Sequence, residues 1–255
     1  MNVVVLVKWV PAPQGTPQMG PDHLLVRTGA EGALDPGDEV GIESALQLVE
    51  REGGEVTVVS MGPDEALAAV QRALAMGAHK GVVVTDDALR GADALATATV
   101  LAAAVRRQPF DLVIGGVEST DGYTGTVPVA VAELLDIPSA TFARKLDVDG
   151  QQVRIERQTE TGYDVVVGTM PILVTVTSAA TEPRFPSLKG VMQAKQKPVD
   201  RLSLADLGLA AAAVNALQEV VAVQDAPEKA AGRVIAGDAD AAGAIADLLA
   251  DAKVI

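Results

Sequence analysis

The feature that most constrains this chain is the alternation, over residues 1–137, of short β-branched runs with longer amphipathic stretches. Each run is nearly continuous in apolar residues, as in a parallel strand that is buried on both faces. Each is followed by residues spaced like the apolar face of a helix. The pattern predicts a doubly wound sheet with right-handed crossovers. Its expected strands are residues 3–7, 55–60, 81–85 and 111–115.

Capping and stop residues mark where the helices begin and end. Asp35 stands before Pro36, which is the order of an N-cap followed by proline at the first helical position. Ile42 and Val49 then fall on one face, and Gly53 ends the helix. Three further helices are expected over residues 62–74, 92–107 and 125–135.

The hydrophobic period changes after residue 140. Short apolar runs over residues 146–148, 153–158, 163–168 and 172–177 are separated by Asp149-Gly150 and Thr161-Gly162. Such turn residues are typical of antiparallel hairpins. We expect these runs to extend the sheet or to form a small flap. The predicted fold class is therefore α/β, a doubly wound, mostly parallel sheet with an antiparallel extension.

The last third of the chain predicts a loop followed by an arm. No helical or strand period persists over residues 178–201, where three prolines indicate an exposed, ordered loop. A short Ala-rich helix, an acidic stretch over residues 224–228 and an amphipathic helix over residues 239–249 follow. Because an arm of this kind cannot bury its apolar stripe on itself, we expect it to lie on another surface. The expected domains are residues 1–201 and a C-terminal arm over residues 202–255.

Composition excludes several classes of protein. There is no cysteine, so disulfides and thiolate metal sites are absent, and the two histidines, His23 and His79, are far apart. A net charge of −14 opposes nucleic-acid binding. The longest apolar stretch, near residues 94–105, is too short to cross a bilayer. We expect a cytoplasmic protein with no membrane insertion and no metal.

The most informative segment is Gly-rich and covers residues 114–128. It joins an expected strand to an expected helix, and it carries four glycines, several hydroxyl groups and Asp121. Glycines let backbone N–H groups approach a ligand, and a helix N-terminus attracts an anion, so the segment is suited to a phosphate group. It matches neither the Walker pattern nor G-x-G-x-x-G. The alternative is a Gly-rich turn with a capping Asp or Thr.

Three other segments are expected at the same edge of the sheet, because ligands of open parallel sheets bind at the carboxyl ends of the strands. They are residues 8–11, 35–38 and 61–63. A solvated strand end for Lys8 and an ordinary helix entry for residues 61–63 remain the alternatives. No nucleophile elbow accompanies Ser60, Ser119 or Ser139. The sequence therefore predicts a nucleotide site without machinery for turnover.

A second informative segment covers residues 182–197, here called the docking loop. Together with Arg201 it holds five basic residues in an acidic chain, and it carries apolar residues in a segment predicted to be exposed. A small apolar anchor ringed by charges is typical of a transient docking site. The alternative is a loop that packs back on its own domain.

Taken together, these segments resemble the β subunit of the electron transfer flavoproteins over nearly the whole chain. The resemblance rests on V-V-V-L-V-K-W-V-P at the start, L-D-P-G-D-E, R-A-L-A-M-G-A-H-K, G-G-V-E-S-T-D-G-Y-T-G-T-V-P, E-P-R-F-P-S-L-K-G-V-M-Q-A-K and the final A-K-V-I. It implies a fold similar to the adenine-nucleotide α-hydrolases and one AMP with a structural role. The AMP contacts that it implies are Leu6, Lys8, Asp35, Gly37, Asp38, Met61, Gly115, Gly116, Ser119, Asp121, Gly122, Tyr123 and Thr124.

The resemblance also implies partners. An α subunit would hold most of the redox FAD and receive the C-terminal arm. The docking residues would be Arg184, Phe185, Leu188, Met192 and Lys195, with Leu188 entering a hydrophobic pocket of acyl-CoA dehydrogenases.

The chain would thus be an electron carrier subunit, not an enzyme, serving fatty acid β-oxidation and related dehydrogenases. Electrons would pass through FAD and an ETF–quinone oxidoreductase to the respiratory chain. Two alternatives remain open. One is a bifurcating type with a second FAD in the AMP place, and the other is a free-standing nucleotide-binding stress or regulatory protein of the same fold.

Overall fold

The computed structural model describes residues 1–11, 18–27, 29–224, 227, 232, 234–235, 237 and 240–254. The chain divides into two compact units, Met1–Val221 and Ala222–Ile255. The first unit extends beyond residue 201, where we expected the α/β domain to end, because Leu204 and Val214 are buried in one of its cores. The second unit holds helix α6 (Ala241–Asp251), none of whose side chains is buried.

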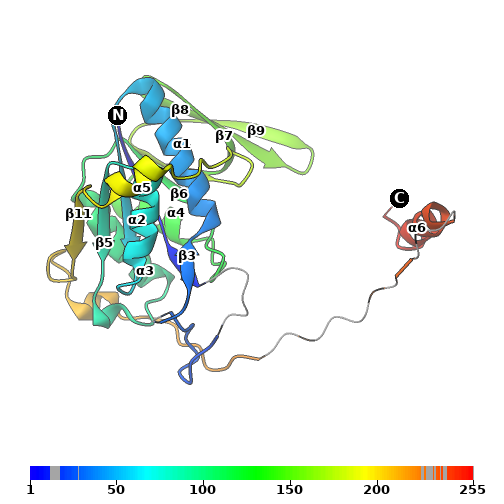
Figure 1. Ribbon diagram of the computed structural model, residues 1–255, viewed down its shortest axis with the longest axis horizontal. Coiled ribbons are helices and arrows are strands. Elements are labelled where there is room, and N and C mark those ends of the chain that lie inside the picture. The colour runs from blue at the N-terminus through cyan, green and yellow to red at the C-terminus, as the bar shows by residue number, and fades with distance from the viewer. Residues whose placement is uncertain are drawn as a thin grey trace. The chain divides into compact units, whose positions relative to one another are not determined.

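The first unit is built on a nine-stranded sheet with the order β11-β5-β4-β1-β6-β10-β7-β8-β9 (Figure 1). Strands β11 through β7 in this order pair in parallel, whereas β7, β8 and β9 pair antiparallel. The predicted fold class is thereby confirmed. The strands are β1 (Asn2–Leu6), β4 (Glu55–Met61), β5 (Lys80–Val84), β6 (Leu112–Gly116), β7 (Ser139–Asp149), β8 (Gln152–Thr159), β9 (Gly162–Thr169), β10 (Ile172–Val176) and β11 (Val199–Leu202).

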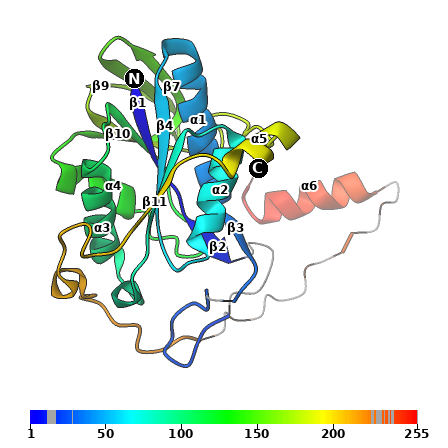
Figure 2. The ribbon, with the colours of Figure 1, turned by 60° about the vertical axis from the view of Figure 1, so that its left-hand side comes forward.

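Helices cover both faces of the parallel part, with α3 and α4 on one side of the strands and α1 and α2 on the other (Figure 2). Alternate residues of β1 enter two separate cores: Val3 and Val5 pack with α1 and α2, and Val4 packs with α3 and α4. The short helix α5 packs against α2. The helices are α1 (Pro36–Glu52), α2 (Ala66–Met76), α3 (Ala94–Arg106), α4 (Val127–Leu135) and α5 (Leu188–Ala194), with short 3-10 turns η1 (Asp87–Leu89) and η2 (Ala211–Val214).

The strand order places a reversal beside β1. The chain passes from β1 to β4 and β5 on one side, and α3 then returns it to β6 on the other side of β1. In doubly wound sheets such a reversal opens a crevice at the carboxyl ends of the strands. The crevice therefore lies where β1 and β6 end.

The beginning of α1 follows the prediction from sequence. The Asp35 side chain accepts a hydrogen bond from the Gly37 N–H at 2.9 Å, Pro36 occupies the first turn, and Gly53 ends the helix with φ 78°. A left-handed φ is one that glycine adopts without the steric cost of a Cβ.

Two expectations about the second half are corrected. Residues 172–177 were grouped with the antiparallel runs, but β10 lies between β6 and β7 and is parallel to both. All five of its residues are buried, which requires a place inside the sheet. Residues 178–201 were expected to lack regular structure, yet they contain α5 and the edge strand β11. Both elements are short and depend on contacts with α2 and β5, so no long period reveals them.

Two smaller differences concern a strand pair in the first 34 residues and the last helix. A separate antiparallel pair, β2 (Trp9–Pro11) with β3 (Gly32–Leu34), was not predicted. The last helix begins at Ala241, and residue 239, where we expected its start, lies outside the described residues, as does most of the acidic stretch 224–228.

Candidate functional site

The site forms at the carboxyl end of β1, where Lys8 joins two segments that are distant in sequence. The Lys8 ammonium donates hydrogen bonds to Ser119 Oγ at 3.1 Å and to Asp121 Oδ1 at 2.7 Å. The Lys8 backbone N–H donates to Asp38 Oδ2 at 2.7 Å. The Gly-rich segment after β6 and the start of α1 thus meet at the end of β1. We call this region, lined by residues 8, 35–38, 61 and 115–124, the crevice.

Asp35 fixes the Gly-rich segment to the first turn of α1. Its Oδ2 accepts the Thr120 N–H at 2.7 Å and the Thr120 hydroxyl at 2.8 Å, and its Oδ1 caps α1 through Gly37. Because Asp35 is fully buried, these three hydrogen bonds replace the water that its carboxylate loses. The position of residues 119–121 is therefore set by α1.

Asp38 is a second buried carboxyl group at the same place. Burial, together with the nearby charge of Asp35, raises its pKa well above the usual value, although the N–H groups of Lys8 and Gly116 oppose this shift. A Cβ on Gly116 would lie 3.0 Å from Asp38 Oδ1 and 3.4 Å from the Gly37 carbonyl carbon. Glycine at position 116 therefore allows β6 to approach the first turn of α1.

Asp121 is held between two cations. Its side chain is 5 % exposed, and it forms ion pairs with Lys8 and with Arg27. Burial would raise its pKa, but the charges of Lys8 and Arg27 outweigh burial and keep the pKa below the usual value. Asp121 is thus an anion with two partners, and its charge is balanced inside the site.

The remaining groups of the crevice suit an anionic nucleotide. The carboxyl groups of Asp35, Asp38 and Asp121 are each hydrogen bonded or ion paired, so none of the three lacks a partner. Lys8 and Arg27 share the one negative charge of Asp121, which leaves positive charge for a ligand. Helix α4 follows the N-cap residue Thr126, whose side chain forms no capping hydrogen bond, and this leaves backbone N–H groups at the helix N-terminus. Backbone amides, hydroxyl groups and an ammonium group are the donors that hold a phosphate.

The Ser60 hydroxyl is an independent sign of a missing polar partner. Ser60 lies near the carboxyl end of β4 and is fully buried, and its Oγ alone among the described buried side-chain atoms has no hydrogen-bond partner. An unpaired buried hydroxyl is unfavourable and indicates a water or ligand. Met61, the next residue and one of the predicted contacts, is half-buried.

The other predicted contacts differ in exposure. Leu6 is buried in one of the two cores, whereas Tyr123 is 65 % exposed and has a left-handed φ of 49°. The N–H groups of Gly122 and Tyr123 donate to the Ser119 carbonyl, which closes a tight turn. Gly115, beside Gly116 at the end of β6, is buried, and Thr124 is exposed.

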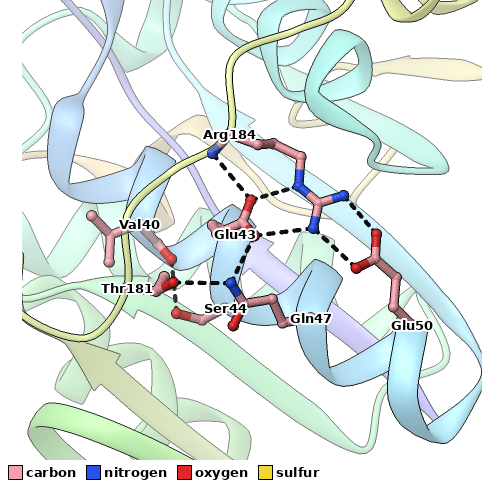
Figure 3. Close-up of polar contacts among 7 residues, drawn as sticks. All are labelled: Val40, Glu43, Ser44, Gln47, Glu50, Thr181 and Arg184. Atoms are coloured by element: carbon pink, nitrogen blue, oxygen red, sulfur yellow. Dashed lines mark hydrogen bonds and ion pairs between the residues drawn. The ribbon is translucent and has the colours of Figure 1, made fainter.

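The docking loop is fixed to α1 at one end by Arg184 (Figure 3). Its guanidinium donates to both oxygens of Glu43, at 2.7 and 3.0 Å, and to both oxygens of Glu50, at 2.6 and 3.0 Å. Burial of Glu43 opposes ionisation, but hydrogen bonds from Arg184 and Gln47 lower its pKa. Arg184, predicted to dock a partner, is thus engaged by its own domain.

The rest of the docking loop presents its apolar residues to solvent. Phe185, Leu188 and Met192 are 88, 80 and 66 % exposed, and Lys195 is also exposed. Leu188 and Met192 line a shallow depression together with Lys189, Gln193 and Gln196. Lys197 fixes the other end of the loop. Its ammonium donates hydrogen bonds to the Leu74 and Ala78 carbonyls at the end of α2.

Two residues beside the crevice, Arg27 and Ser60, were missed from sequence, and the pairing of a third, Thr120, was not predicted. Arg27 lies outside every recognisable motif, and no signal pointed to it. Ser60 precedes the expected contact Met61, and a buried hydroxyl at a strand end could have been found from that position. Thr120 stands inside the Gly-rich segment, but its pairing with Asp35 depends on the fold.

Comparisons with known proteins identify the family to which the chain belongs. The fold and the crevice define an α/β protein with a candidate nucleotide site. Residues 22–207 match the family model of the electron transfer flavoprotein domain. Proteins named electron transfer flavoprotein subunit beta from Mycobacterium bovis and Bacillus subtilis are 38 % and 39 % identical. These matches cover 100 % and 89 % of this chain and 99 % and 90 % of the relatives. A relative of that name from Megasphaera elsdenii is 34 % identical over 80 % of the chain.

The chain belongs to the electron transfer flavoprotein family, as a β subunit. Members of this family carry electrons and are not enzymes, and a β subunit implies an α subunit as its partner. Within the described residues, no helix is long and apolar enough to cross a membrane, and no group of three metal-binding side chains is found.

Proposed function

We propose that this β subunit binds one AMP in the crevice and passes electrons within a heterodimer. The observation that carries the proposal is the convergence of Lys8, the Asp35–Asp38 turn and the Gly-rich segment at the reversal between β1 and β6. Lys8 and Arg27 supply positive charge for the phosphate. The unpaired Ser60 hydroxyl supplies a further polar contact.

The redox chemistry belongs to FAD, which accepts and releases electrons one at a time, and the α subunit holds most of it. This chain supplies a rigid scaffold and the docking loop. Leu188 and Phe185 would contact acyl-CoA dehydrogenases and related dehydrogenases. The electrons would then go on, through an ETF–quinone oxidoreductase, to the respiratory chain. Contact must be brief, because the carrier exchanges partners in each cycle, and a small exposed apolar patch suits weak binding. A cytoplasmic location is part of this proposal.

The test is purification of the heterodimer with identification of its nucleotide and a count of its flavins. One flavin with AMP supports the proposal. Two flavins per heterodimer would instead indicate the bifurcating type. A stable monomer that carries ATP and no flavin would indicate a free-standing nucleotide-binding protein, and the proposal would be wrong.

A further inference from the structure

Residues 18–27, which lie between β2 and β3, fold into a compact loop that is separate from the Gly-rich segment. Met19 and Leu25 form an antiparallel bridge, and the Gly20 N–H donates to the Leu24 carbonyl at 2.8 Å. These bonds close the loop on itself, as in the compact surface loops that often carry function. We call this segment the 18–27 loop.

The tip of the 18–27 loop contacts the chain just after β5. Asp22 forms an ion pair with Arg90. The Leu24 side chain lies against Gly91, where a Cβ would be 3.3 Å from Leu24 Cδ1. Both partners follow β5 and the short turn η1. One part of the loop is therefore held beside the carboxyl end of β5.

The last residue of the loop contacts the chain after β6 and β1. Arg27 forms its ion pair with Asp121, which lies in the Gly-rich segment after β6. The Arg27 guanidinium also lies 3.5 Å from the carbonyl oxygen of Trp9, which follows β1. One short loop thus joins residues that follow three different strands.

These contacts place the 18–27 loop across the crevice. In the sheet order β5-β4-β1-β6, two strands lie between the two that the loop joins. Three strand spacings amount to about 14 Å, and the chain from Asp22 to Arg27 can span about 17 Å when extended. Figures 1 and 2 both show the loop, in blue, beyond the lower end of the sheet, where the parallel strands end. The loop therefore covers the crevice at the carboxyl ends of the strands.

The 18–27 loop also brings a cation to the part of the crevice proposed for the phosphate. The side chains of Lys8 and Arg27 are 37 and 29 % exposed, and both bind Asp121, which is 5 % exposed. Two cations and one anion leave this group with a net charge of +1. A single phosphate group can use that charge, whereas a second phosphate beyond it would meet the carboxylate of Asp121.

The loop is fastened by contacts that lie outside the crevice. Asp22 and Arg90 are 36 and 70 % exposed. His23 Nδ1 lies 3.2 Å from the Val220 carbonyl oxygen. These contacts use no residue of the crevice, so a substitution can loosen the loop without removing a proposed ligand contact.

We propose that the 18–27 loop is a lid that restricts the crevice to a mononucleotide. A dinucleotide continues from its first phosphate through a second one, which would have to pass the ion pair between Arg27 and Asp121. AMP ends at its first phosphate and fits beneath the closed lid. The inference rests on the proposed function, because it takes the phosphate to lie at Lys8 and Arg27, and it excludes a second FAD from the crevice.

The test compares AMP with ADP-ribose, which extends AMP by a second phosphate and a ribose. In calorimetric titrations of nucleotide-stripped heterodimer, the wild type should bind AMP about tenfold more tightly or better. Arg90→Glu places a like charge opposite Asp22 and loosens the lid, so this preference should fall about threefold or more. The charge swap D22K/R90E should restore the preference.

The matched control is Arg51→Glu. It makes the same change of charge in an exposed ion pair, at the end of α1 that lies away from the crevice. The control should keep the wild-type preference for AMP. An equal fall in preference in Arg51→Glu and Arg90→Glu would overturn the proposal, as would a wild type that binds ADP-ribose as tightly as AMP.

Hydrogen exchange of the wild-type heterodimer tests the lid without any variant. Saturating AMP should protect the amides of residues 18–27 from exchange, whereas saturating ADP-ribose should not. Equal protection by the two ligands would show that the loop does not close selectively over a mononucleotide. Failure of the wild-type heterodimer to bind AMP would instead contradict the proposed function itself, so the two failures are distinguishable.

Discussion

At the scale of single residues, the ion pairs of Arg184 connect the docking loop to the rigid part of the molecule. Arg184 lies near the start of the loop, and Glu43 and Glu50 lie two turns apart on α1. A guanidinium group binds carboxylates through pairs of parallel hydrogen bonds, which fixes direction as well as distance. The loop can therefore expose Leu188 and Phe185 without collapsing onto its own domain.

Replacing Arg184 with Gln should destabilise the protein by about 2 kcal/mol, because Glu43 would remain buried without its charged partner. Thermal unfolding measures the loss, and limited proteolysis of residues 182–197 measures the release of the loop. Arg51→Gln serves as the control, since the Arg51–Glu52 pair is exposed and should contribute little. An equal loss of stability in both variants would contradict the conclusion that Arg184 fixes the docking loop to α1.

The same contact predicts a pH dependence. The folded-state pKa values of Glu43 and Glu50 are lowered, through hydrogen bonds that Arg184 donates to both. Their contribution to stability is then fully present above the unfolded pKa of about 4.3 and is lost as pH falls through the folded pKa values. The difference in unfolding free energy between wild type and Arg184→Gln should therefore shrink below about pH 4 in denaturant titrations.

Substitution of Leu188 tests the proposed docking of dehydrogenases. Leu188→Ala should slow electron transfer from an acyl-CoA dehydrogenase about tenfold or more, because a hot-spot anchor is worth about 1.4 kcal/mol or more when removed. Flavin and AMP content should stay unchanged, since Leu188 is 80 % exposed and is not one of the crevice residues. Stopped-flow reduction of the flavin measures the rate. An unchanged rate would show that the docking assignment is wrong.

At the scale of elements, α5 is positioned by its close approach to α2. A Cβ built on Gly190 would lie 2.4 Å from the Ala75 carbonyl oxygen. The Ser187 hydroxyl caps α5 through the Gly190 N–H, and Lys197 binds carbonyl groups at the end of α2. Tertiary contacts therefore stabilise this short helix, because a helix of seven residues is too short to be stable alone.

Gly190→Ala should displace α5, since the backbone of α2 cannot yield as a flexible side chain would. We expect a loss of about 1–3 kcal/mol, as for other overpacked sites, together with slower electron transfer from the dehydrogenase. Lys189→Ala, at the neighbouring exposed position, should leave stability unchanged. Thermal melts of the heterodimers compare the two, and a Gly190→Ala protein as stable as the wild type would contradict the close approach of α5 to α2.

At the scale of the whole molecule, the proposed binding of a nucleotide in the crevice would affect stability. The nucleotide would join β1, β4, β6 and the first turn of α1, which are distant in sequence. A ligand that binds only the folded state stabilises it by mass action. Structural AMP would therefore act on the entire first unit.

Adding AMP to nucleotide-stripped heterodimer at about 100 times its dissociation constant should stabilise it by about 2.7 kcal/mol. For a chain of this size the melting temperature should rise by roughly 5–10 °C. Lys8→Met should weaken the response to AMP by removing a cation from the phosphate site, whereas Lys189→Met should not. Differential scanning fluorimetry measures the shifts. A response to adenosine equal to that of AMP would contradict the phosphate contact.

The sequence by itself determined the first half of this protein, with strands β1, β4, β5 and β6 and the helices between them. Its strands, α1 and the Gly-rich segment each carry a local signal, such as a doubly buried apolar run, the Asp35-Pro36 cap or a cluster of glycines. The crevice could be predicted because parallel strands end at a common edge. Those signals concern neighbours in the chain, and the local structure follows from them.

Only the tertiary structure decided the rest. Three features depend on residues that are far apart in sequence: the position of β10 inside the sheet, the packing of α5 on α2, and the ion pair of Arg184 with Glu43. The same is true of Arg27 beside Asp121 and of the unpaired Ser60 hydroxyl. A buried polar or charged group needs a partner in place of water, and the tertiary fold decides which distant residue becomes that partner. Local sequence patterns carry no information about such pairs.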